Sequence, residues 1–482
     1  MNKPLRRVSV FCLVLVLALM GWVTWIQVAK ASAYQDDPHN PRVAIGKYGA
    51  PLGNILVGGE PVTGSAATSS TLKYKRTYKD GPLYAPVTGF SSQIFGSNQL
   101  ESLYGDLLDG SDSRLRTPAD ALTRTRAKGG DVATTIDPKV QKAGYEALAG
   151  KKGAAVALDP ATGRVLGLVS TPSYDPGKFA GSSAADQKAW QKLTGDPDHP
   201  EVNRALRQPL PPGSTFKLVV AAAALENGLY SSVDEPTDSP DPYTLPHTRT
   251  TLKNENAAAP CKNATLRTAL QYSCNTVFAK MAVDLGKDKV RAQAEKFGFN
   301  NDRVDIPVRA AKSVYPSDMD QAQTALSGIG QFDDQATPLQ MAMVASAIAG
   351  GGELKAPQLV DKLTDGGGNT VQENSPRRYG KAMSARTAEQ LRSAMRTVVE
   401  QGTGANAKID GLTVGGKTGT AQHGVDNSGT PYAWFVSYAE DGAGHRVAVA
   451  VMVEDSDAAR GEVSGNGLAA PVARAMMKAA LG

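Results

Sequence analysis

The chain of 482 residues suits two or three domains of about 100–200 residues each, and its 41% hydrophobic content is enough to bury a sizeable core. A net charge of +5 is small for this length, and no cluster of lysine and arginine recurs with interleaved aromatic residues, so we expect no nucleic-acid partner. The chain has five histidines and no CxxC or HxxxH spacing, and we therefore expect neither a metal ion nor another cofactor.

The N-terminal segment predicts a membrane anchor. Residues 8–28 are almost uninterrupted hydrocarbon and follow three basic residues. An apolar helix of about 20 residues spans a bilayer, and positive charge before it favours a cytoplasmic N-terminus. We therefore expect residues 1–7 in the cytoplasm, a single pass of the cell membrane at 8–28, and an extracytoplasmic remainder. A cleaved secretory signal is the alternative, because Ala31-Ser32-Ala33 resembles a cleavage site, but the length of the apolar run favours retention.

Two of the three cysteines, Cys261 and Cys274, lie in the part of the chain that is expected to be exported, whereas Cys12 lies in the anchor. An oxidising compartment permits a disulfide between them. They are equally compatible with two small buried hydrophobic residues. Both alternatives stay open, because a disulfide depends on a geometry that the sequence does not show.

Residues 29–130 are rich in Gly, Pro, Ser and Thr, and predict an extended pedestal of β or irregular structure. Within it we expect short strands at Asn54–Val57 and Tyr84–Val87, and a helical turn around Gln99–Leu108.

The sequence changes in character at Asp131, and we expect a second domain over residues 131–482. It should open with a strand at Ala133–Asp137, a helix at Pro138–Ala149 and a β-hairpin within Gly153–Ser170. The next predicted helices are Thr215–Glu226, Thr265–Leu285 with a break near Ser273, Thr337–Ala349 and Ala385–Gln401. Strands are then expected at Leu412–Gln422, Ala433–Tyr438 and Arg446–Glu454, before a last helix at Ala469–Leu481. Strands at both ends with helices between them predict an α/β (α+β) fold, with one sheet built from both ends and a helical subdomain beside it.

The segment Pro211 to Lys217 reads PPGSTFK, which places Ser214 in the first turn of a helix and Lys217 one turn later on the same face. A serine needs a base to remove its proton, and a lysine can serve only if its own charge is suppressed. The start of the helix also offers backbone N–H groups to a developing oxyanion. The spacing alone is weak, because a helix cap also favours serine and a second copy occurs at Ser70–Lys73, which we expect to be structural.

A second short motif, Ser273-Cys274-Asn275, falls where the predicted helix 265–285 is broken. The Ser273 hydroxyl can relay a proton to a leaving amine, and the Asn275 carboxamide can hold a substrate amide and the lysine amine. A polar turn is the alternative, and Ser464-Gly465-Asn466 has the same pattern in a Gly-rich loop.

The third motif, Lys417-Thr418-Gly419-Thr420, lies in a predicted strand. A cation beside a hydroxyl can bind a carboxylate, Gly419 lets a ligand approach the backbone, and the Thr420 N–H can complete an oxyanion hole with that of Ser214. An edge strand protected by a lysine is the alternative.

Together, SxxK, SxN and KTG in this order resemble the motifs of the penicillin-recognising serine transferases and hydrolases, over roughly residues 131–482. Smaller matches support the resemblance, among them Asn203-Arg204-Ala205, Gly328–Gln331 and Thr337–Gln340. It implies the penicillin-binding transpeptidase (serine β-lactamase-like) fold, an antiparallel sheet flanked by helices with an all-helical subdomain. The anchor and the β-rich, dimerisation-like pedestal resemble class B penicillin-binding proteins, most of all a small actinobacterial subgroup called penicillin-binding protein A.

This resemblance implies a peptidoglycan D,D-transpeptidase. Lys217 would take the Ser214 proton as Ser214 attacks a stem peptide ending in D-Ala-D-Ala, and an amine of a neighbouring stem peptide would then resolve the acyl-serine. The implied site consists of the catalytic residues Ser214, Lys217, Ser273, Asn275 and Lys417, and the substrate-binding residues Thr418, Gly419 and Thr420. The implied partners are nascent peptidoglycan stem peptides, β-lactams, the cytoplasmic membrane, and divisome or elongation proteins, with roles in cell wall synthesis, division and shape.

Three other functions remain open at this point. A D,D-carboxypeptidase would use the same residues with water as the acceptor. A β-lactam sensor would use Ser214 only to be acylated, but residues 1–7 leave almost nothing inside the cell to carry a signal. A non-enzymatic divisome scaffold is the third. No glutamate can be assigned as a base for deacylation, so we expect a long-lived β-lactam adduct.

Overall fold

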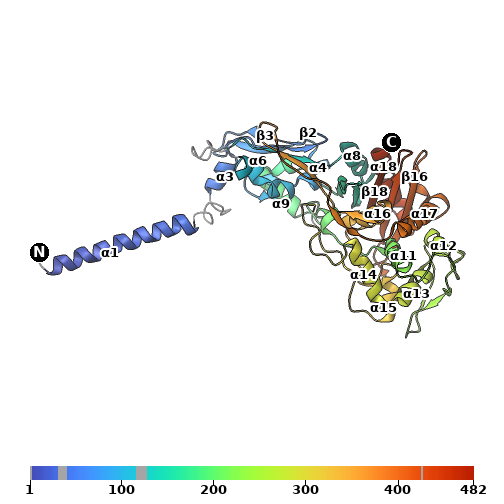
Figure 1. The fold of residues 1–482 in the computed structure, drawn as a ribbon. Helices are drawn as coiled ribbons and strands as arrows, with labels where there is room; N and C mark the ends of the chain where they lie inside the picture. Colours follow the sequence, from blue (N-terminus) through green and yellow to red (C-terminus); the bar gives the residue numbers. More distant parts are fainter. Residues whose placement is uncertain (1–2, 31–40, 116–126, 305, 425–426) are drawn as a thin grey trace.

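The computed structural model describes residues 3–30, 41–115, 127–304, 306–424 and 427–482. Helix α1 (Lys3–Trp25) continues as a π-helical turn at Ile26–Lys30, and none of its residues is buried. It projects away from the rest of the molecule (Figure 1), and in the described part of the chain it is the one helix long and apolar enough to cross a membrane. The alternative cleavage site at residues 31–33 lies outside the described residues.

The pedestal is a mixture of short strands and helices rather than mainly β structure. Its elements are α3 (Pro41–Lys47), β1 (Ile55–Val57), β2 (Glu60–Pro61), β3 (Thr63–Ala67), β4 (Tyr74–Tyr78), α4 (Gly81–Thr88), β5 (Ser91–Ser92), β6 (Gly96–Ser97), α5 (Gln99–Leu103) and α6 (Gly105–Asp109). The predicted strand at 54–57 and the predicted helical turn at 99–108 are both found.

The strand predicted at Tyr84–Val87 is wrong, because these residues lie in helix α4. Pro82 stands in the first turn, where its fixed φ suits a helix. Six of the eight residues of α4 are buried, and the helix packs against α5 and strand β9 (Val165–Thr171). A short run that is apolar on every side carries no period that separates a helix from a strand.

One mixed sheet crosses the boundary that was predicted between residues 130 and 131. Its order is β14-β13-β7-β1-β2, and it combines the two pedestal strands with β7 (Asp131–Thr134), β13 (Val360–Thr364) and β14 (Thr370–Glu373). Strand β7 pairs in parallel with β1 and antiparallel with β13. The pedestal and the remainder of the chain are therefore joined by backbone hydrogen bonds.

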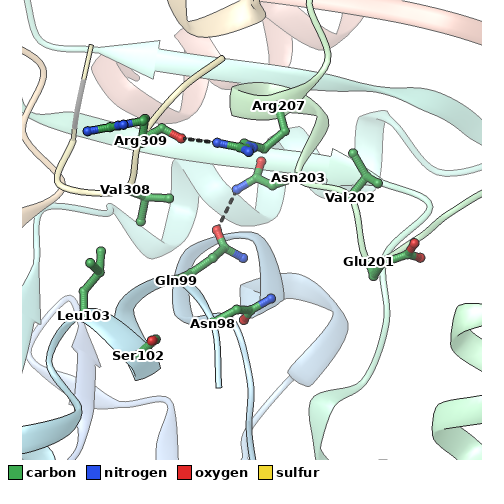
Figure 2. A pocket seen from close by; sticks show the side chains of 10 residues that line it. All are labelled: Asn98, Gln99, Ser102, Leu103, Glu201, Val202, Asn203, Arg207, Val308 and Arg309. Atoms are coloured by element: carbon green, nitrogen blue, oxygen red, sulfur yellow. Dashed lines mark hydrogen bonds between the residues drawn. The ribbon is translucent and has the colours of Figure 1, made fainter. Parts of the chain in front are cut away.

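A side-chain contact joins the same two parts at a second place (Figure 2). The Asn203 side chain comes from the segment that precedes the Ser214 motif, and its Nδ2 donates to the Pro86 carbonyl oxygen and to Gln99 Oε1, each at 2.8 Å. Beside it lies a cavity of about 450 Å³ that is also lined by Leu103 and Val308.

The central sheet is formed by both ends of the remaining chain, as predicted. Its five antiparallel strands have the order β16-β17-β18-β8-β9. Their bounds are β8 (Lys151–Leu158), β9, β16 (Thr413–Ala421), β17 (Tyr432–Glu440) and β18 (Arg446–Ser456). Helices α8 (Pro138–Ala147) and α18 (Ala470–Leu481) cover one face, whereas α16 (Pro338–Ala349) packs on the other (Figure 1).

Strand β18 shows why the sheet has two covered faces. Its valines, Val447, Val449, Val451 and Val453, belong to the core beneath α8 and α18. The alternate residues Ala448, Ala450 and Met452 belong to the core beneath α16. Successive side chains of a strand point to opposite faces, so an uninterrupted apolar strand is buried on both sides.

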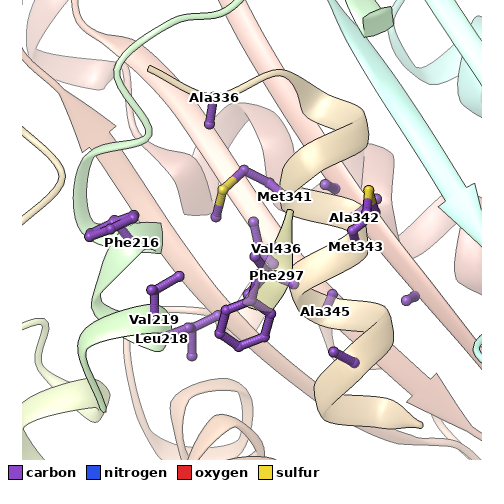
Figure 3. Close-up of a cluster of buried hydrophobic side chains, with 14 of the residues drawn as sticks. Phe216, Leu218, Val219, Phe297, Ala336, Met341, Ala342, Met343, Ala345 and Val436 are labelled. Carbon is purple, nitrogen blue, oxygen red and sulfur yellow. The ribbon is translucent and has the colours of Figure 1, made fainter. Parts of the chain in front are cut away.

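The helical subdomain lies beside this sheet and contains the start of the candidate site. It consists of α11 (Lys217–Glu226), α12 (Leu266–Gln271), α13 (Asn275–Leu285), α14 (Lys287–Phe297) and α15 (Gln321–Ser327), with α17 (Ala385–Gln401) between it and β16. Every residue of α16 is buried, and Figure 3 shows the Met341 side chain of this helix extending toward the side where Phe216, the residue before α11, lies. The remaining elements are α9 (Ala184–Thr194), α10 (Arg204–Arg207), β10 (Tyr243–Thr244), β11 (Thr251–Leu252), β12 (Glu353–Lys355) and β15 (Arg378–Lys381).

Candidate active site

Ser214 lies in a tight turn that is wedged between two other segments. The turn is a 3₁₀ helix, Gly213–Phe216, and α11 begins directly after it at Lys217. Gly213 has φ +52°, and its N–H donates to the Gly330 carbonyl oxygen at 2.9 Å. A Cβ on Gly213 would lie 3.1 Å from the Ala421 Cβ of strand β16. Glycine therefore satisfies both the backbone conformation and the close approach.

Lys217 is buried completely, and its amine is held by the second motif. Its Nζ donates to the Ser273 carbonyl oxygen at 2.8 Å, to Ser273 Oγ at 3.2 Å and to Asn275 Oδ1 at 2.7 Å. Burial lowers the pKa of Lys217 well below its ordinary value, and the nearby Lys417 charge lowers it further. A lysine with a depressed pKa can be an uncharged base at neutral pH.

The break between α12 and α13 aims the second motif at Lys217. Ser273 has φ +57°, a left-handed conformation that interrupts the helix. Cys274 then caps α13, and Asn275 is its first residue. Cys274 forms a disulfide with Cys261, which decides the alternative that the sequence left open. Serine is uncommon in this conformation, and such backbone outliers concentrate at functional sites.

The third motif lies on β16, at the edge of the central sheet that faces the Ser214 turn. Lys417 is also buried completely, and its Nζ donates to Ser273 Oγ at 2.9 Å and to the Thr418 carbonyl oxygen at 2.8 Å. Burial lowers the pKa of Lys417 to about 7. The Ser273 hydroxyl therefore lies between two lysine amines, and the low-dielectric surroundings disfavour a charge on both at once.

The remaining predicted residues lie in the same place. The Thr418 hydroxyl is 2.9 Å from that of Thr403. Gly419 lies against the nucleophile turn, because a Cβ there would be 2.9 Å from Thr215 Cγ2. Thr420 is the next residue of this strand and precedes Ala421, the neighbour of Gly213. The structure thus brings all eight predicted site residues to one location.

Both repeated motifs lie elsewhere in structural settings. Ser70 to Lys73 occupies the turn between β3 and β4, where the Ser70 hydroxyl donates to the Leu72 carbonyl oxygen at 2.9 Å. Ser464 caps a π-helical turn, Gly465–Ala469, that packs behind Gly419: a Cβ on Gly465 would lie 2.9 Å from the Gly419 N. The Ser464-Gly465-Asn466 segment therefore packs against strand β16 at Gly419.

Sequence reasoning missed three contributors to this geometry. Gly330 receives the Gly213 N–H, Thr403 contacts Thr418, and Glu255 is an exposed acidic residue whose charge acts on both lysines. Gly330 belongs to the segment Gly328–Gln331, which supported the family resemblance, so the sequence did mark this position although it did not predict the contact with Gly213. Thr403 and Glu255 lie in no recognisable pattern.

The chain resembles proteins of known family over almost its whole length. Residues 153–478 match the Penicillin binding protein transpeptidase domain, and residues 52–132 match the Penicillin binding protein A dimerisation domain. The sequence is 39% identical to the peptidoglycan D,D-transpeptidase PbpA of Mycolicibacterium smegmatis, a comparison that covers 100% of this chain and 99% of that protein. It is 38% identical to PbpA of Mycobacterium tuberculosis, with the same coverage.

Solved structures show the same likeness. A ceftriaxone acyl-enzyme complex of penicillin-binding protein A from M. tuberculosis matches with a TM-score of 0.83 and 37% identity, covering 91% of this chain and 100% of that one. Pseudomonas aeruginosa PBP2 matches with a TM-score of 0.74 and 27% identity, covering 89% of this chain and 96% of that one.

Proposed function

This chain belongs to the penicillin-binding protein transpeptidase family and is a peptidoglycan D,D-transpeptidase, and we propose that Ser214 is its nucleophile. One observation carries the assignment. A completely buried lysine one turn after Ser214 has its amine fixed by the Ser273 and Asn275 side chains. A lysine with this environment can act as a base, and the Ser214 hydroxyl lies one helical turn before it.

In the first half-reaction, the Lys217 amine accepts the Ser214 proton while Oγ attacks the penultimate D-Ala carbonyl of a stem peptide. The N–H groups of Ser214 and Thr420 receive the oxyanion, and the protonated Lys217 returns its proton through Ser273 to the departing D-Ala amine. The C–N bond breaks and an acyl-serine remains. Asn275 holds Lys217 in position, and its carboxamide can also form a hydrogen bond with the substrate amide.

Lys417, Thr418 and Thr420 bind the terminal carboxylate of the donor. With its pKa near 7, Lys417 is only partly charged in the empty site. An arriving carboxylate favours the protonated form, so the charge that binds the substrate strengthens as the substrate enters. Gly419 leaves room for the substrate backbone beside β16.

In the second half-reaction, an amine of a neighbouring stem peptide attacks the acyl-serine and forms the cross-link. β-Lactams present a reactive amide and a carboxylate in the same arrangement, and the M. tuberculosis relative has been solved as acyl-enzymes with ceftriaxone, imipenem and penicillin G. We propose that they acylate Ser214 here and that the adduct is long-lived. A D,D-carboxypeptidase would use the same site residues, with water instead of an amine as the acceptor.

The cellular setting is proposed from the anchor and the relatives. Helix α1 would hold the protein in the cell membrane with residues 1–7 inside and the pedestal (29–130) and the transpeptidase region (131–482) outside. Nascent peptidoglycan supplies the stem peptides, and divisome or elongation proteins would direct the enzyme to cell division or cell shape.

Covalent labelling tests the assignment of Ser214. The full-length protein in detergent is treated with a fluorescent penicillin, digested and examined by mass spectrometry. We expect the label on the peptide that contains Ser214, and no label on the Ser214→Ala variant. Ser70→Ala is the matched control, because it removes the serine of the second SxxK copy and should label normally. A label on any other residue would refute the assignment.

A further inference from the structure

The loop of residues 253–263 is fastened at three points to the Ser273 motif and to Thr276, the residue that follows it. The Lys253 carbonyl oxygen accepts from Asn275 Nδ2 at 3.4 Å, and Asn254 Oδ1 accepts from the Thr276 N–H at 3.1 Å. At the other end of the loop, Cys261 is disulfide-bonded to Cys274. The loop therefore has a fixed position relative to the relay hydroxyl, although much of it is exposed.

Glu255 lies between these attachments and is exposed to solvent. It follows Asn254 directly, so the α13 contacts restrict where its side chain can lie. Its charge raises the pKa of both Lys217 and Lys417, opposing the effect of burial. Both lysines therefore lie within electrostatic reach of this one carboxylate, which is exposed to solvent.

The two substrates of a transpeptidase carry opposite charges where they meet this carboxylate. The donor stem peptide brings a terminal carboxylate, which Lys417 attracts and Glu255 repels. The acceptor brings an amine that is protonated in water. An exposed carboxylate on the loop tied to Cys274, Asn275 and Thr276 therefore attracts the acceptor ammonium group.

We propose that Glu255 determines acceptor specificity, by receiving the acceptor ammonium group at the entrance to the acyl-enzyme. This proposal rests on the proposed transpeptidase function and adds the residue that recognises its second substrate. The ammonium first loses one proton to water beside the Glu255 carboxylate. The free amine then attacks the ester carbonyl, Lys217 accepts its second proton and returns it to Ser214 Oγ, and the C–O bond breaks as the new amide forms.

The test compares two nucleophiles on one acyl-enzyme. The full-length protein in detergent is given a peptidyl thioester donor together with either a diamino acid amide, which is cationic at neutral pH, or hydroxylamine, which is uncharged. The ratio of transfer product to hydrolysis product is measured for each nucleophile. The variant is Glu255→Gln, and Glu60→Gln, an exposed acidic residue of the pedestal, is the matched control.

We expect Glu255→Gln to lower the transfer ratio for the cationic amine about three- to fivefold, the range of an exposed charge pair, and added salt to diminish the difference. The ratio for hydroxylamine should not change. Acylation by the anionic benzylpenicillin should become faster, because a repulsive charge has gone. Glu60→Gln should behave as the wild type throughout.

Two results would overturn the proposal. One is an unchanged transfer ratio for the cationic amine in Glu255→Gln, and the other is an equal fall for hydroxylamine. If the wild type itself transferred the acyl group to neither nucleophile, the transpeptidase assignment would fail instead, so the two failures are distinguishable.

Discussion

Replacement of Lys417 by methionine should stabilise the protein at low pH while abolishing donor binding. The Lys417 amine is fully buried, and its pKa falls from 10.5 to about 7. That difference corresponds to about 5 kcal/mol between the charged and neutral forms. Because the folded pKa lies below the unfolded one, the unfolded chain binds more protons between about pH 7 and 10.5. The wild type should therefore gain stability as pH rises through this window, and carry the full penalty below it.

Methionine removes this penalty but also removes two hydrogen bonds, to Ser273 Oγ and to the Thr418 carbonyl oxygen. At about 1 kcal/mol each, their loss leaves Lys417→Met more stable than the wild type by about 3 kcal/mol near pH 6. Near pH 10.5 the penalty has vanished, and the variant should be less stable by about 2 kcal/mol. The sign of the effect therefore reverses with pH.

Urea unfolding of the full-length protein at pH 6 and pH 10 measures this reversal. Trp434 is fully buried in strand β17 opposite Gly419, so its contribution to the tryptophan fluorescence reports on the region concerned. Labelling by fluorescent penicillin should be lost in Lys417→Met at both pH values. A variant that is less stable than the wild type at pH 6, or a difference that does not change with pH, would refute the reasoning.

Three other predictions concern the same site. The second-order rate of acylation by benzylpenicillin should have a bell-shaped pH profile, rising as Lys217 loses its proton and falling above about pH 7 as Lys417 loses its charge; stopped-flow measurement of a profile without the alkaline fall would contradict the role of Lys417. Gly213→Ala should slow acylation by up to about tenfold, because the φ of +52° and the 3.1 Å approach to Ala421 would shift the Ser214 turn by tenths of an ångström; intact-mass labelling that proceeds at the wild-type rate would contradict it. Cys261→Ala should lower the free energy of unfolding by about 2–4 kcal/mol and slow acylation, because the disulfide holds the residue between Ser273 and Asn275; an unchanged denaturation midpoint would show that the loop is held by its other contacts.

The sequence was most informative where a motif coincided with an expected break in an element. Ser273 was placed at an interruption of a predicted helix, and the structure shows a left-handed residue there. Ser214 was placed at the start of a helix after Pro-Gly, and the turn is found as expected, although its first four residues are 3₁₀. In both cases the local chemistry of the chain is sufficient, because caps and breakers act over a few residues.

The remainder depends on contacts between distant segments, which a single sequence does not contain. The residues of helix α4 were predicted as a strand. Most of them are buried, so the run shows no alternation of apolar and polar residues that would distinguish a helix from a strand. Thr403 is placed by its contact with Thr418, and Glu255 lies on a loop whose Lys253 carbonyl oxygen accepts from Asn275. Neither residue has a local signal in the sequence. The pairing of Cys261 with Cys274 was left open for the same reason.

The sheet that joins β1 to β7 and β13 limits how the enzyme can be divided for recombinant work. A fragment beginning at residue 131 would leave the hydrogen-bonding edge of β7 open and remove the Gln99 partner of Asn203. Exposed strand edges of this kind invite aggregation. The shortest soluble version of the enzyme should therefore begin between the end of the anchor helix at Lys30 and the start of β1 at Ile55, and a catalytic core trimmed by sequence homology alone should express poorly.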